Sequence, residues 1–256
     1  MKAAIITAAG ISSRFNAGTA EEEKCLKSIY QESKGGDTLL LHLLIHCSYA
    51  EKIIVVGGYR FQDLEAYIKN DLPKSLSSKV VLVCNPYYEK RSSGYSLYVG
   101  LKEAFKEREL KEVLFVEGDL DIDEDSFRKV IKSDSDVLTY NYKPINTKNA
   151  VVLYRTQDNR YHYAFNTHHG LLTIKDSFSC ILNSGQLWKF TDINALTEAC
   201  RIFHEGNQEG TNLAIIQEYI DRIAQEHIAV LGLRRWTNCN TREDFHKITK
   251  IWEEEA

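Results

Sequence analysis

Four short apolar segments, each about the length of a β-strand, recur through the first half of this 256-residue chain. They span residues 3–7, 52–57, 79–84 and 112–117. Segments with helical composition, at residues 38–47, 61–69 and 96–105, separate them. Because strands that alternate with helices form parallel sheets covered on both faces, this order predicts an α/β fold. The near-continuous apolar character of the strands agrees, since strands buried on both faces need no polar side.

The second half follows a different pattern. Strand-like segments at residues 136–140, 149–155, 161–165 and 175–182 have no long helices between them, which predicts antiparallel strands that form a lid. Helices are expected at residues 194–205 and 212–225, a strand at 227–233 and a helix at 241–252. Thr241 and Asp244 have the spacing of a helix capping box. The predicted fold is a Rossmann-like, mostly parallel mixed sheet flanked by helices, with a small antiparallel β insertion in the second half.

Composition narrows the classes of partner. The formal net charge is −4, so bulk electrostatics do not favour nucleic acid or an anionic membrane. No apolar run approaches the roughly 20 residues of a transmembrane helix, and the first residues enter a strand rather than a secretory signal. The six cysteines show no C-x-x-C spacing, which favours reduced thiols over a zinc site or disulfides. These observations predict a cytoplasmic protein.

A loop of small residues follows the first predicted strand, with the sequence AAGISSRF at residues 8–15. Backbone N–H groups at such a turn can cradle phosphate, and Gly10 lets a ligand approach closely. Arg14 adds a planar fork of donors for phosphate oxygens. The loop lacks the lysine of a P-loop and the second glycine of a dinucleotide fingerprint. The alternative is an ordinary tight turn between a strand and a helix.

The combination AAG-x-x-S-R-F, a short polar flap at residues 16–23 and then K-x-L resembles the first signature of the GT-A-like nucleotidyltransferases. This resemblance implies that the loop holds a nucleoside triphosphate and that Arg14 and Lys24 are catalytic. Family members commonly have a proline before the lysine, where this chain has Glu23, so Lys27 is the second candidate. The nucleotide-binding residues that the resemblance implies for the loop are Ala8, Ala9, Gly10, Ile11, Ser12 and Ser13.

Residues 85–98 are similar to the bacterial CTP:phosphocholine-type cytidylyltransferase branch of that superfamily. Asn85 begins an N-x-x-Y segment after the third predicted strand, and Ser96 lies in a Y-S-L segment that opens a helix. The resemblance implies that Ser96 reads cytosine and that Asn85 belongs to the nucleotide pocket. A helix N-cap is the structural alternative for Ser96.

The fourth predicted strand ends in Gly-Asp, at residues 118–119. Ligands bind at the carboxyl ends of strands in open parallel sheets, and magnesium prefers oxygen ligands that it shares with phosphates. Asp119 therefore suits a Mg²⁺ ligand, the role that the resemblance also implies. Asp121, two residues on, points the same way if the strand continues. The acids at residues 123–125 are expected to lie exposed in a turn. Near the C-terminus, where many relatives carry an acid as second ligand, this chain offers only the amides Asn238 and Asn240.

The acceptor is expected to bind in the second half. His168 and His169 lie on a turn and can donate to phosphate, and Lys189 is a further candidate. The other cationic candidates are Lys143, Lys148, Arg234 and Arg235. Trp188 is expected in the core.

The leading hypothesis is a cytidylyltransferase that transfers CMP from CTP to a small phosphorylated or phosphonate acceptor and releases pyrophosphate. Phosphocholine, an aminoalkyl phosphonate and a phospho-amino acid such as phosphoglutamine stay open as acceptors. A sugar-1-phosphate nucleotidyltransferase, a non-catalytic nucleotide-binding module and a glycosyltransferase are the alternatives. We expect one domain, with a nucleotide-binding half at residues 1–130 and an acceptor-binding, closing half at 131–256. The assembly state is open, with a homodimer as one candidate.

Overall fold

The computed structural model describes residues 1–146, 151–165 and 172–255. Four parallel strands form one side of its central sheet: β1 (Lys2–Ala8), β2 (Lys52–Gly57), β3 (Val80–Cys84) and β4 (Glu112–Glu117). β1 lies between β2 and β4, and its side chains at Ala3 to Ile6 are fully buried. The predicted parallel α/β sheet is confirmed, and β2 and β4 have the predicted bounds.

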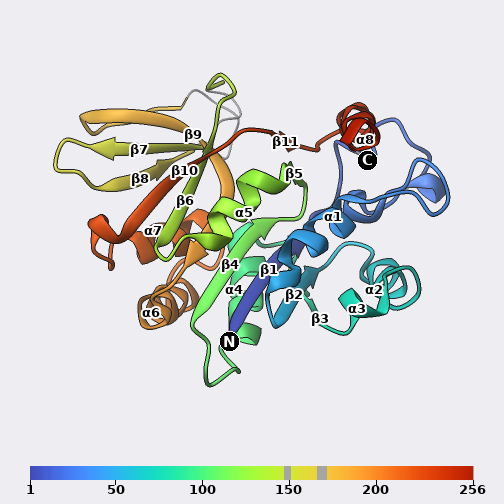
Figure 1. The fold of residues 1–256 in the computed structure, drawn as a ribbon, viewed down its shortest axis with the longest axis horizontal. Helices are drawn as coiled ribbons and strands as arrows, with labels where there is room; N and C mark the ends of the chain where they lie inside the picture. The colour runs from blue at the N-terminus through green and yellow to red at the C-terminus, as the bar shows by residue number, and fades with distance from the viewer. Residues whose placement is uncertain (147–150, 166–171, 256) are drawn as a thin grey trace.

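The second half extends the same sheet (Figure 1). Its strands are β6 (Asp136–Asn141), β7 (Val152–Thr156), β8 (Tyr161–Ala164), β9 (Phe178–Phe190) and β10 (Ile228–Leu233). The order across the sheet is β10-β6-β9-β4-β1-β2-β3, and β7 and β8 form an antiparallel extension from β9. β9 runs antiparallel to both β4 and β6, so it joins the two halves into one mixed sheet, as predicted.

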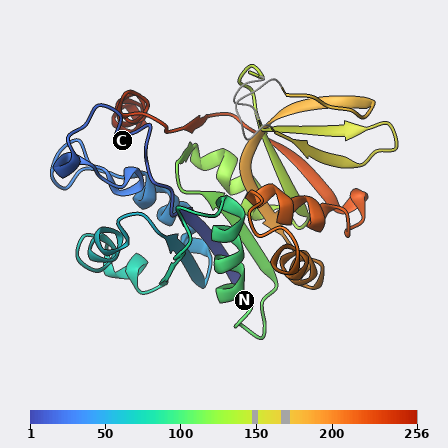
Figure 2. The same ribbon diagram turned by 180° about the vertical axis from the view of Figure 1, so that it is seen from behind.

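Helices cover both faces of the sheet (Figures 1 and 2). One face packs against α1 (Leu39–His46), α2 (Phe61–Asn70), α3 (Lys74–Ser77) and α5 (Glu124–Lys132). The other packs against α4 (Ser93–Ala104), α6 (Ile193–Glu205) and α7 (Asn212–Ile220). β1 shows why both faces are needed, because Ala4 and Ile6 join the first cluster while Ala3 and Ile5 join the second.

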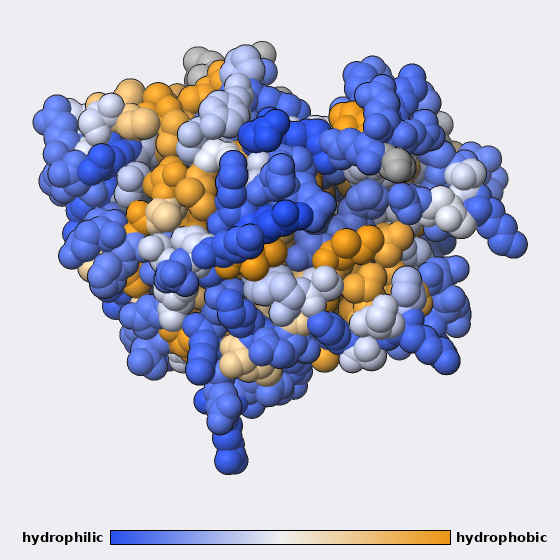
Figure 3. Space-filling view, viewed as in Figure 1, coloured by the Kyte–Doolittle hydropathy of each residue, from blue (hydrophilic) through white to orange (hydrophobic). Residues whose placement is uncertain are grey.

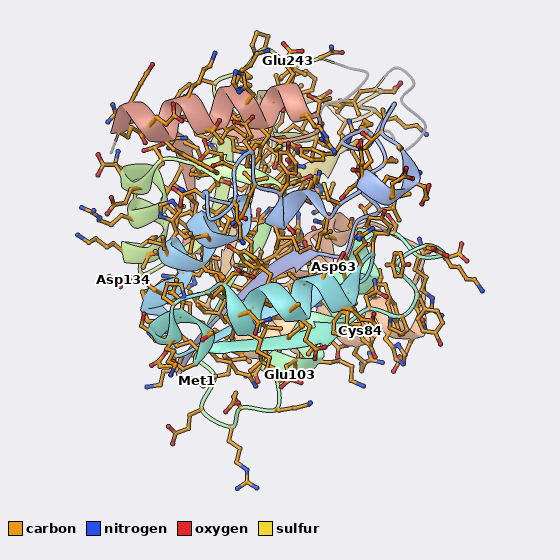
Figure 4. The ribbon with its side chains drawn as sticks, turned by 90° about the vertical axis from the view of Figure 1, so that its right-hand side faces the viewer. Met1, Asp63, Cys84, Glu103, Asp134 and Glu243 are labelled. Atoms are coloured by element: carbon orange, nitrogen blue, oxygen red, sulfur yellow. The ribbon has the colours of Figure 1, made fainter. Side chains whose placement is uncertain are left out.

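The C-terminal helix α8 (Arg242–Glu255) packs over the segment that follows β1. Its N-terminus carries the predicted capping box: the Thr241 N–H donates to Asp244 Oδ2 at 2.9 Å, and the Asp244 N–H donates to Thr241 Oγ1 at 3.1 Å. Phe245 and Trp252 bury their rings in a small cluster that includes Phe15. Figure 4 shows α8, with Glu243 labelled, at the opposite end of the molecule from Met1. α8 therefore lies at the carboxyl end of β1.

Three local features differ from the sequence predictions. The acids at residues 123–125, expected as an exposed turn, begin α5, and Asp123 Oδ1 caps it by accepting from the Ser126 N–H at 2.9 Å. No α-helix directly follows the loop after β1, where the described chain forms only the 3₁₀ turns Glu21–Glu23 and Lys27–Ile29 before α1. The strand predicted at residues 175–182 begins only at Phe178 and continues to Phe190 as β9.

A two-stranded antiparallel ribbon of β5 (Leu120–Ile122) and β11 (Trp236–Asn238) connects the end of β4 to α8. Two more 3₁₀ turns, Cys47–Tyr49 and Gln225–His227, complete the elements of the described chain. No helix in the described ranges is long and apolar enough to cross a membrane. On the face in Figure 3 hydrophilic side chains predominate, with apolar ones gathered in a few patches.

Candidate functional site

Two neighbouring cavities open where β1 and β4 end. The loop cavity has a volume of about 370 Å³, and the β9 cavity about 440 Å³. Arg14, Glu117, Asp119 and Asn240 line both of them, so the two cavities meet at these side chains. The loop cavity is also lined by Thr7, Ala9, Gly10, Ile11, Ser12, Ser13, Phe15, Lys27, Tyr88, Arg91, Ser92, Ser93 and Ser96. The β9 cavity is also lined by Lys143, Pro144, Asn146, Val151, Asn183, Ser184, Gln186, Trp236 and Asn238.

The loop at residues 9–15 forms one wall of the loop cavity, as predicted from its small residues. Its unusual backbone lies at Ser12, with φ of 54°, and not at Gly10. The Ser12 hydroxyl oxygen accepts from the Lys27 N–H at 3.2 Å, which fixes the loop against the segment after the flap. The flap itself is anchored by Asn16, whose amide exchanges two hydrogen bonds with the Cys25 backbone. Ala8 is buried and outside the lining of both cavities.

Gly118 brings the end of β4 against the end of β1. A Cβ atom at this position would lie 2.5 Å from the Thr7 carbonyl oxygen, too close for any side chain. The Gly118 N–H donates to that same oxygen at 2.9 Å. Asp119 consequently leaves the sheet beside the loop that follows β1.

Lys27, and not Lys24, is the lysine of the site. Its ammonium lies 2.7 Å from Asp119 Oδ2 and 3.0 Å from the Cys239 carbonyl oxygen. Lys24 lies outside both cavities, with its ammonium 2.5 Å from Glu21 Oε2 on the surface. Lys24 directly follows the 3₁₀ turn at Glu21–Glu23, and its ammonium pairs with the first residue of that turn.

Three side-chain oxygens, on residues that line the β9 cavity, have no hydrogen-bond partner among the described residues. They are Asp119 Oδ1, Asn238 Oδ1 and Asn240 Oδ1, and all three are buried. Asn238 and Asn240 flank Cys239, whose N–H donates to the Asp119 carbonyl oxygen at 2.8 Å, so the three residues are neighbours. Buried polar atoms without partners are costly in the absence of a ligand. Three oxygens of this kind suit a hard cation such as Mg²⁺.

Glu117 is a site residue that the sequence analysis missed. Its carboxylate lies between the two cavities and accepts a hydrogen bond from Asn212 Nδ2 at 2.6 Å. Burial raises the pKa of Glu117, and the nearby Asp119 raises it further. Its position at the carboxyl end of an apolar strand, two residues before Asp119, was the available signal.

Asp121 does not share the surroundings of Asp119, which corrects its prediction as a metal ligand. It is a buried residue of β5 whose carboxylate pairs with Arg235 and accepts from Trp252 Nε1 at 2.9 Å. It lines neither cavity. The chain turns between Gly118 and Leu120 to enter β5, so the alternation expected for a continuing strand does not hold.

Asn85 and Ser96 form a hydrogen-bonded pair at the far end of the loop cavity. Asn85 Oδ1 accepts from the Tyr87 N–H at 2.9 Å, and Asn85 Nδ2 donates to Ser96 Oγ at 2.9 Å. Ser96 lines the cavity, whereas Asn85 is fully buried behind it. Ser96 lies within α4 and is not its N-cap, since that helix begins at Ser93.

Arg234 and Arg235 line neither cavity, and the other acceptor candidates separate into three groups. Lys189 is buried away from both cavities, where its ammonium pairs with Glu112 at 3.0 Å and donates to two backbone carbonyls, so it is a structural residue. His168, His169 and Lys148 lie outside the described residues. Lys143 lines the β9 cavity, and its ammonium lies 5.2 Å from the centre of the Trp236 ring. Trp188 is fully buried, as predicted.

Positive charge in the two cavities comes from several elements. Arg14 and Lys143 have no ion-pair partner in the part of the chain that the structure describes. The Arg91 guanidinium stacks 4.5 Å and 4.3 Å from the ring centres of Tyr87 and Tyr95. These cations and the Lys27 ammonium surround the two cavities with positive charge, which attracts a polyanion to the region near Asp119.

Solved structures share this fold. The inositol-1-phosphate CTP transferase from T. maritima superposes with a TM-score of 0.66 at 16% identity, over 95% of this chain and 91% of that one. The CTP:phosphocholine cytidylyltransferase from Streptococcus pneumoniae gives 0.62 at 15% identity, over 98% and 99%. A UDP-glucose pyrophosphorylase in complex with UDP-glucose gives 0.69 at 12% identity, over the full length of both chains. The fold is therefore that of nucleotidyltransferase structures.

A search of curated proteins finds no match to this sequence. Residues 23–252 match the family described as a domain of unknown function, DUF6564. The match begins at the last residue of the flap and spans Lys27, the whole central sheet after β1 and most of α8. The chain therefore belongs to the DUF6564 family.

Proposed function

We propose that this protein is a nucleotidyltransferase that transfers CMP from CTP to a small phosphorylated acceptor and releases pyrophosphate. The observation that carries the proposal is the position of Asp119 between Lys27 and the loop at residues 9–15, at the junction of two cavities. One cavity suits the nucleotide and the other the acceptor, and the reacting phosphates meet where the cavities join. The fold shared with a CTP transferase and a cytidylyltransferase supports this assignment.

The reaction needs positioning more than acid–base chemistry. An oxygen of the acceptor phosphate attacks the α-phosphorus of CTP in line, the new P–O bond forms, and the bond to the β-phosphate oxygen breaks. The nucleophile is already an anion at neutral pH, so no general base is required. Arg14 and Lys27 hold the triphosphate and stabilise the charge on its oxygens as pyrophosphate leaves.

The chemistry of the junction fits Mg²⁺. Asp119 Oδ1 would supply the carboxylate ligand, and the amide oxygens of Asn238 and Asn240 would supply neutral ones. When bound, Mg²⁺ contributes positive charge at the phosphate oxygens. The Lys27 ammonium donates to Asp119 Oδ2 at 2.7 Å, so it holds that side chain in place at the junction. Within the described chain no three His, Cys, Asp or Glu side chains are grouped to hold a metal, which makes the amide oxygens part of this proposal.

The Asn85–Ser96 pair supports a cytosine base. The Tyr87 N–H fixes which end of the Asn85 amide faces Ser96, and the amide NH₂ then donates to Ser96 Oγ. The Ser96 hydroxyl hydrogen is left to donate into the loop cavity. Cytosine presents the acceptors O2 and N3 side by side, whereas uracil presents an N–H at position 3. A hydroxyl that donates at position 3 of the base therefore favours cytosine.

The test is nucleotide binding followed by a pyrophosphate-release screen with Mg²⁺, using CTP, UTP and dTTP and a set of phosphorylated acceptors. We expect CTP to bind most tightly and to release pyrophosphate with at least one acceptor. Turnover with UTP or dTTP and none with CTP would favour the sugar-1-phosphate alternative. Tight CTP binding without pyrophosphate release from any acceptor would favour a non-catalytic module.

A further inference from the structure

The β9 cavity differs from the loop cavity in the chemistry of its walls. Besides the residues at the junction, its described lining is dominated by carboxamides and one lysine, with a single aromatic ring. Asn183 and Gln186 each carry both a donor and an acceptor group, and Asn238 contributes its Nδ2 donor. Hydroxyl groups also donate and accept, so a wall of carboxamides suits a ligand with many hydroxyls.

Gln186 is held toward this cavity by an uncommon backbone conformation. Its φ is 54°, in the left-handed region that residues other than glycine seldom adopt. The distortion lies in β9, where the pairing with β6 shifts register between Leu138 and Tyr140. The Ser184 hydroxyl supports it by accepting from the Gln186 N–H at 3.2 Å, and Gln186 Oε1 accepts from Asn238 Nδ2 at 3.4 Å. A strained backbone at a cavity wall indicates a side chain placed for a ligand.

Lys143 determines which charge the cavity accepts. Its ammonium covers the face of Trp236, the one aromatic ring in the described lining, and it makes no ion pair in the described ranges. A quaternary ammonium needs free aromatic faces, and here a cation already occupies the available one. An acceptor phosphate, in contrast, can lie between Lys143 and Arg14 next to the junction.

We propose that the acceptor is the phosphate ester of an uncharged, hydroxyl-rich body such as a sugar or cyclic polyol, which Gln186 and the neighbouring carboxamides bind, and not a choline-type cation. This inference rests on the proposed transfer reaction and makes it more specific. The carboxamide wall binds the body, while Lys143 and Arg14 bind its phosphate. The Nε1–H of Trp236 donates to the Gly185 carbonyl oxygen at 2.7 Å. This hydrogen bond fixes the ring on which the Lys143 ammonium lies.

The first test compares binding of acceptors by calorimetry, with Mg²⁺ and a non-hydrolysable CTP analogue present. The probes are glucose 1-phosphate and inositol 1-phosphate against phosphocholine. We expect at least one of the two uncharged bodies to bind at least about tenfold more tightly than phosphocholine, as one or two well-placed hydrogen bonds provide. Equal or tighter binding of phosphocholine, or no binding of either uncharged probe, would overturn the inference while CTP binding still supports the proposed function. Absence of CTP binding would contradict both the inference about the acceptor and the proposed transfer reaction.

The second test changes Gln186 itself. Gln186→Gly removes the carboxamide but tolerates the positive φ, so it separates ligand binding from backbone strain. We expect it to raise KM for the uncharged acceptor about tenfold without lowering Tm. Gln186→Glu keeps the shape and adds a negative charge, and it should shift the ratio of affinities toward phosphocholine. Asn159→Gly, at a turn residue with φ of 66° outside both cavities, is the matched control and should leave KM unchanged. An unchanged affinity ratio in Gln186→Glu would contradict the role of Gln186.

Discussion

Two aspartates separated by one residue have different surroundings. Asp119 has one free, buried oxygen and one oxygen on Lys27 at the junction of the two cavities. Asp121 has both oxygens engaged, by Arg235 and Trp252, in the packing between β5 and α8. The first therefore suits ligand binding, and the second connects parts of the fold.

Replacing each aspartate by asparagine should separate these roles. We expect Asp119→Asn to lower kcat by about 100-fold or more, because it removes the charged ligand at the phosphates, with little change in Tm. Asp121→Asn should lower the free energy of unfolding by about 1–3 kcal/mol, because a buried charge loses its partner, while kcat per folded molecule changes little. Denaturant titration and pyrophosphate release measure the two effects. Similar losses of kcat in both variants would contradict the assignment.

His46 gives a prediction for pH dependence. It lies in the last turn of α1, stacked on Phe127 with ring centres 4.8 Å apart. Burial lowers the pKa of His46 below its ordinary value of 6.5, and the neighbouring His42 and Arg235 lower it further, against opposing effects of Glu124 and the Ile122 carbonyl. The unfolded chain therefore takes up a proton at a higher pH than the folded chain does.

As pH falls below about 6.5, the free energy of unfolding should consequently decrease. Urea titrations between pH 7.5 and 5 measure this slope in the wild type and in His46→Gln. We expect the stability difference between the two proteins to shrink toward low pH, because the variant has no imidazole to protonate. Parallel stability curves would show that His46 is not the group responsible.

Individual site residues were predictable where the main chain alone determines their position. Ser12, Arg14 and Asp119 follow strand ends, and parallel strands end at one edge of the sheet. Lys24 and Asp121 were misplaced because their directions depend on a 3₁₀ turn and a chain reversal that composition does not specify. Glu117 was missed because a terminal strand glutamate is usually solvated, and its burial depends on Asn212, 95 residues away in sequence.

At the scale of elements, α8 links the C-terminus to the loop after β1. Phe15 and Tyr30 pack edge-to-face on Phe245, with ring centres 6.4 Å and 5.1 Å away. Such packing anchors the end of the loop at residues 9–15, because Phe15 is both its last residue and part of the cavity lining. A helix that begins only after Asn240 thus supports the cavity wall formed by the loop.

The capping box of α8 can be tested directly. Thr241→Ala removes the hydroxyl that accepts from the Asp244 N–H, and we expect it to cost about 1 kcal/mol of unfolding free energy. Thr211→Ala is the matched control, because Thr211 precedes α7 but makes no side-chain capping bond. Chemical denaturation of both variants gives the comparison. An equal cost for the two substitutions would mean that the capping bond contributes nothing beyond the loss of a hydroxyl.

The elements themselves were largely predictable, since β2 and β4 match their predicted bounds and α8 begins at the predicted cap. The local sequence pattern did not predict the elements whose formation depends on tertiary contacts. Asp123 to Asp125 are charged and resemble a turn, yet the helix that they begin buries Phe127 and Val130 against the sheet. The length of β9 was also not apparent, because its first residues extend outward with β7 while its last residues lie in the core.

At the scale of the whole molecule, β9 joins the two halves into one sheet. It enters the sheet between β4 of the first half and β6 of the second, and its residues Leu187 to Phe190 are buried. The predicted boundary at residue 130 therefore falls in α5 of a continuous sheet and not in a linker. Separating the halves would expose the edge of β4, whose residues Val113 to Val116 are fully buried.

We therefore predict that the protein unfolds in one cooperative transition and that residues 1–130 do not fold alone. Urea unfolding followed by far-ultraviolet circular dichroism and by tryptophan fluorescence should give coincident curves. The fluorescence signal reports on the second half alone, because all three tryptophans lie there while β1 to β4 lie in the first. The fragment 1–130 should lack a cooperative transition, since β4 loses its partner strand β9 and its edge becomes exposed. Two separated transitions, or a cooperatively folded fragment, would show that the nucleotide-binding half is an independent domain and that β9 only docks on it.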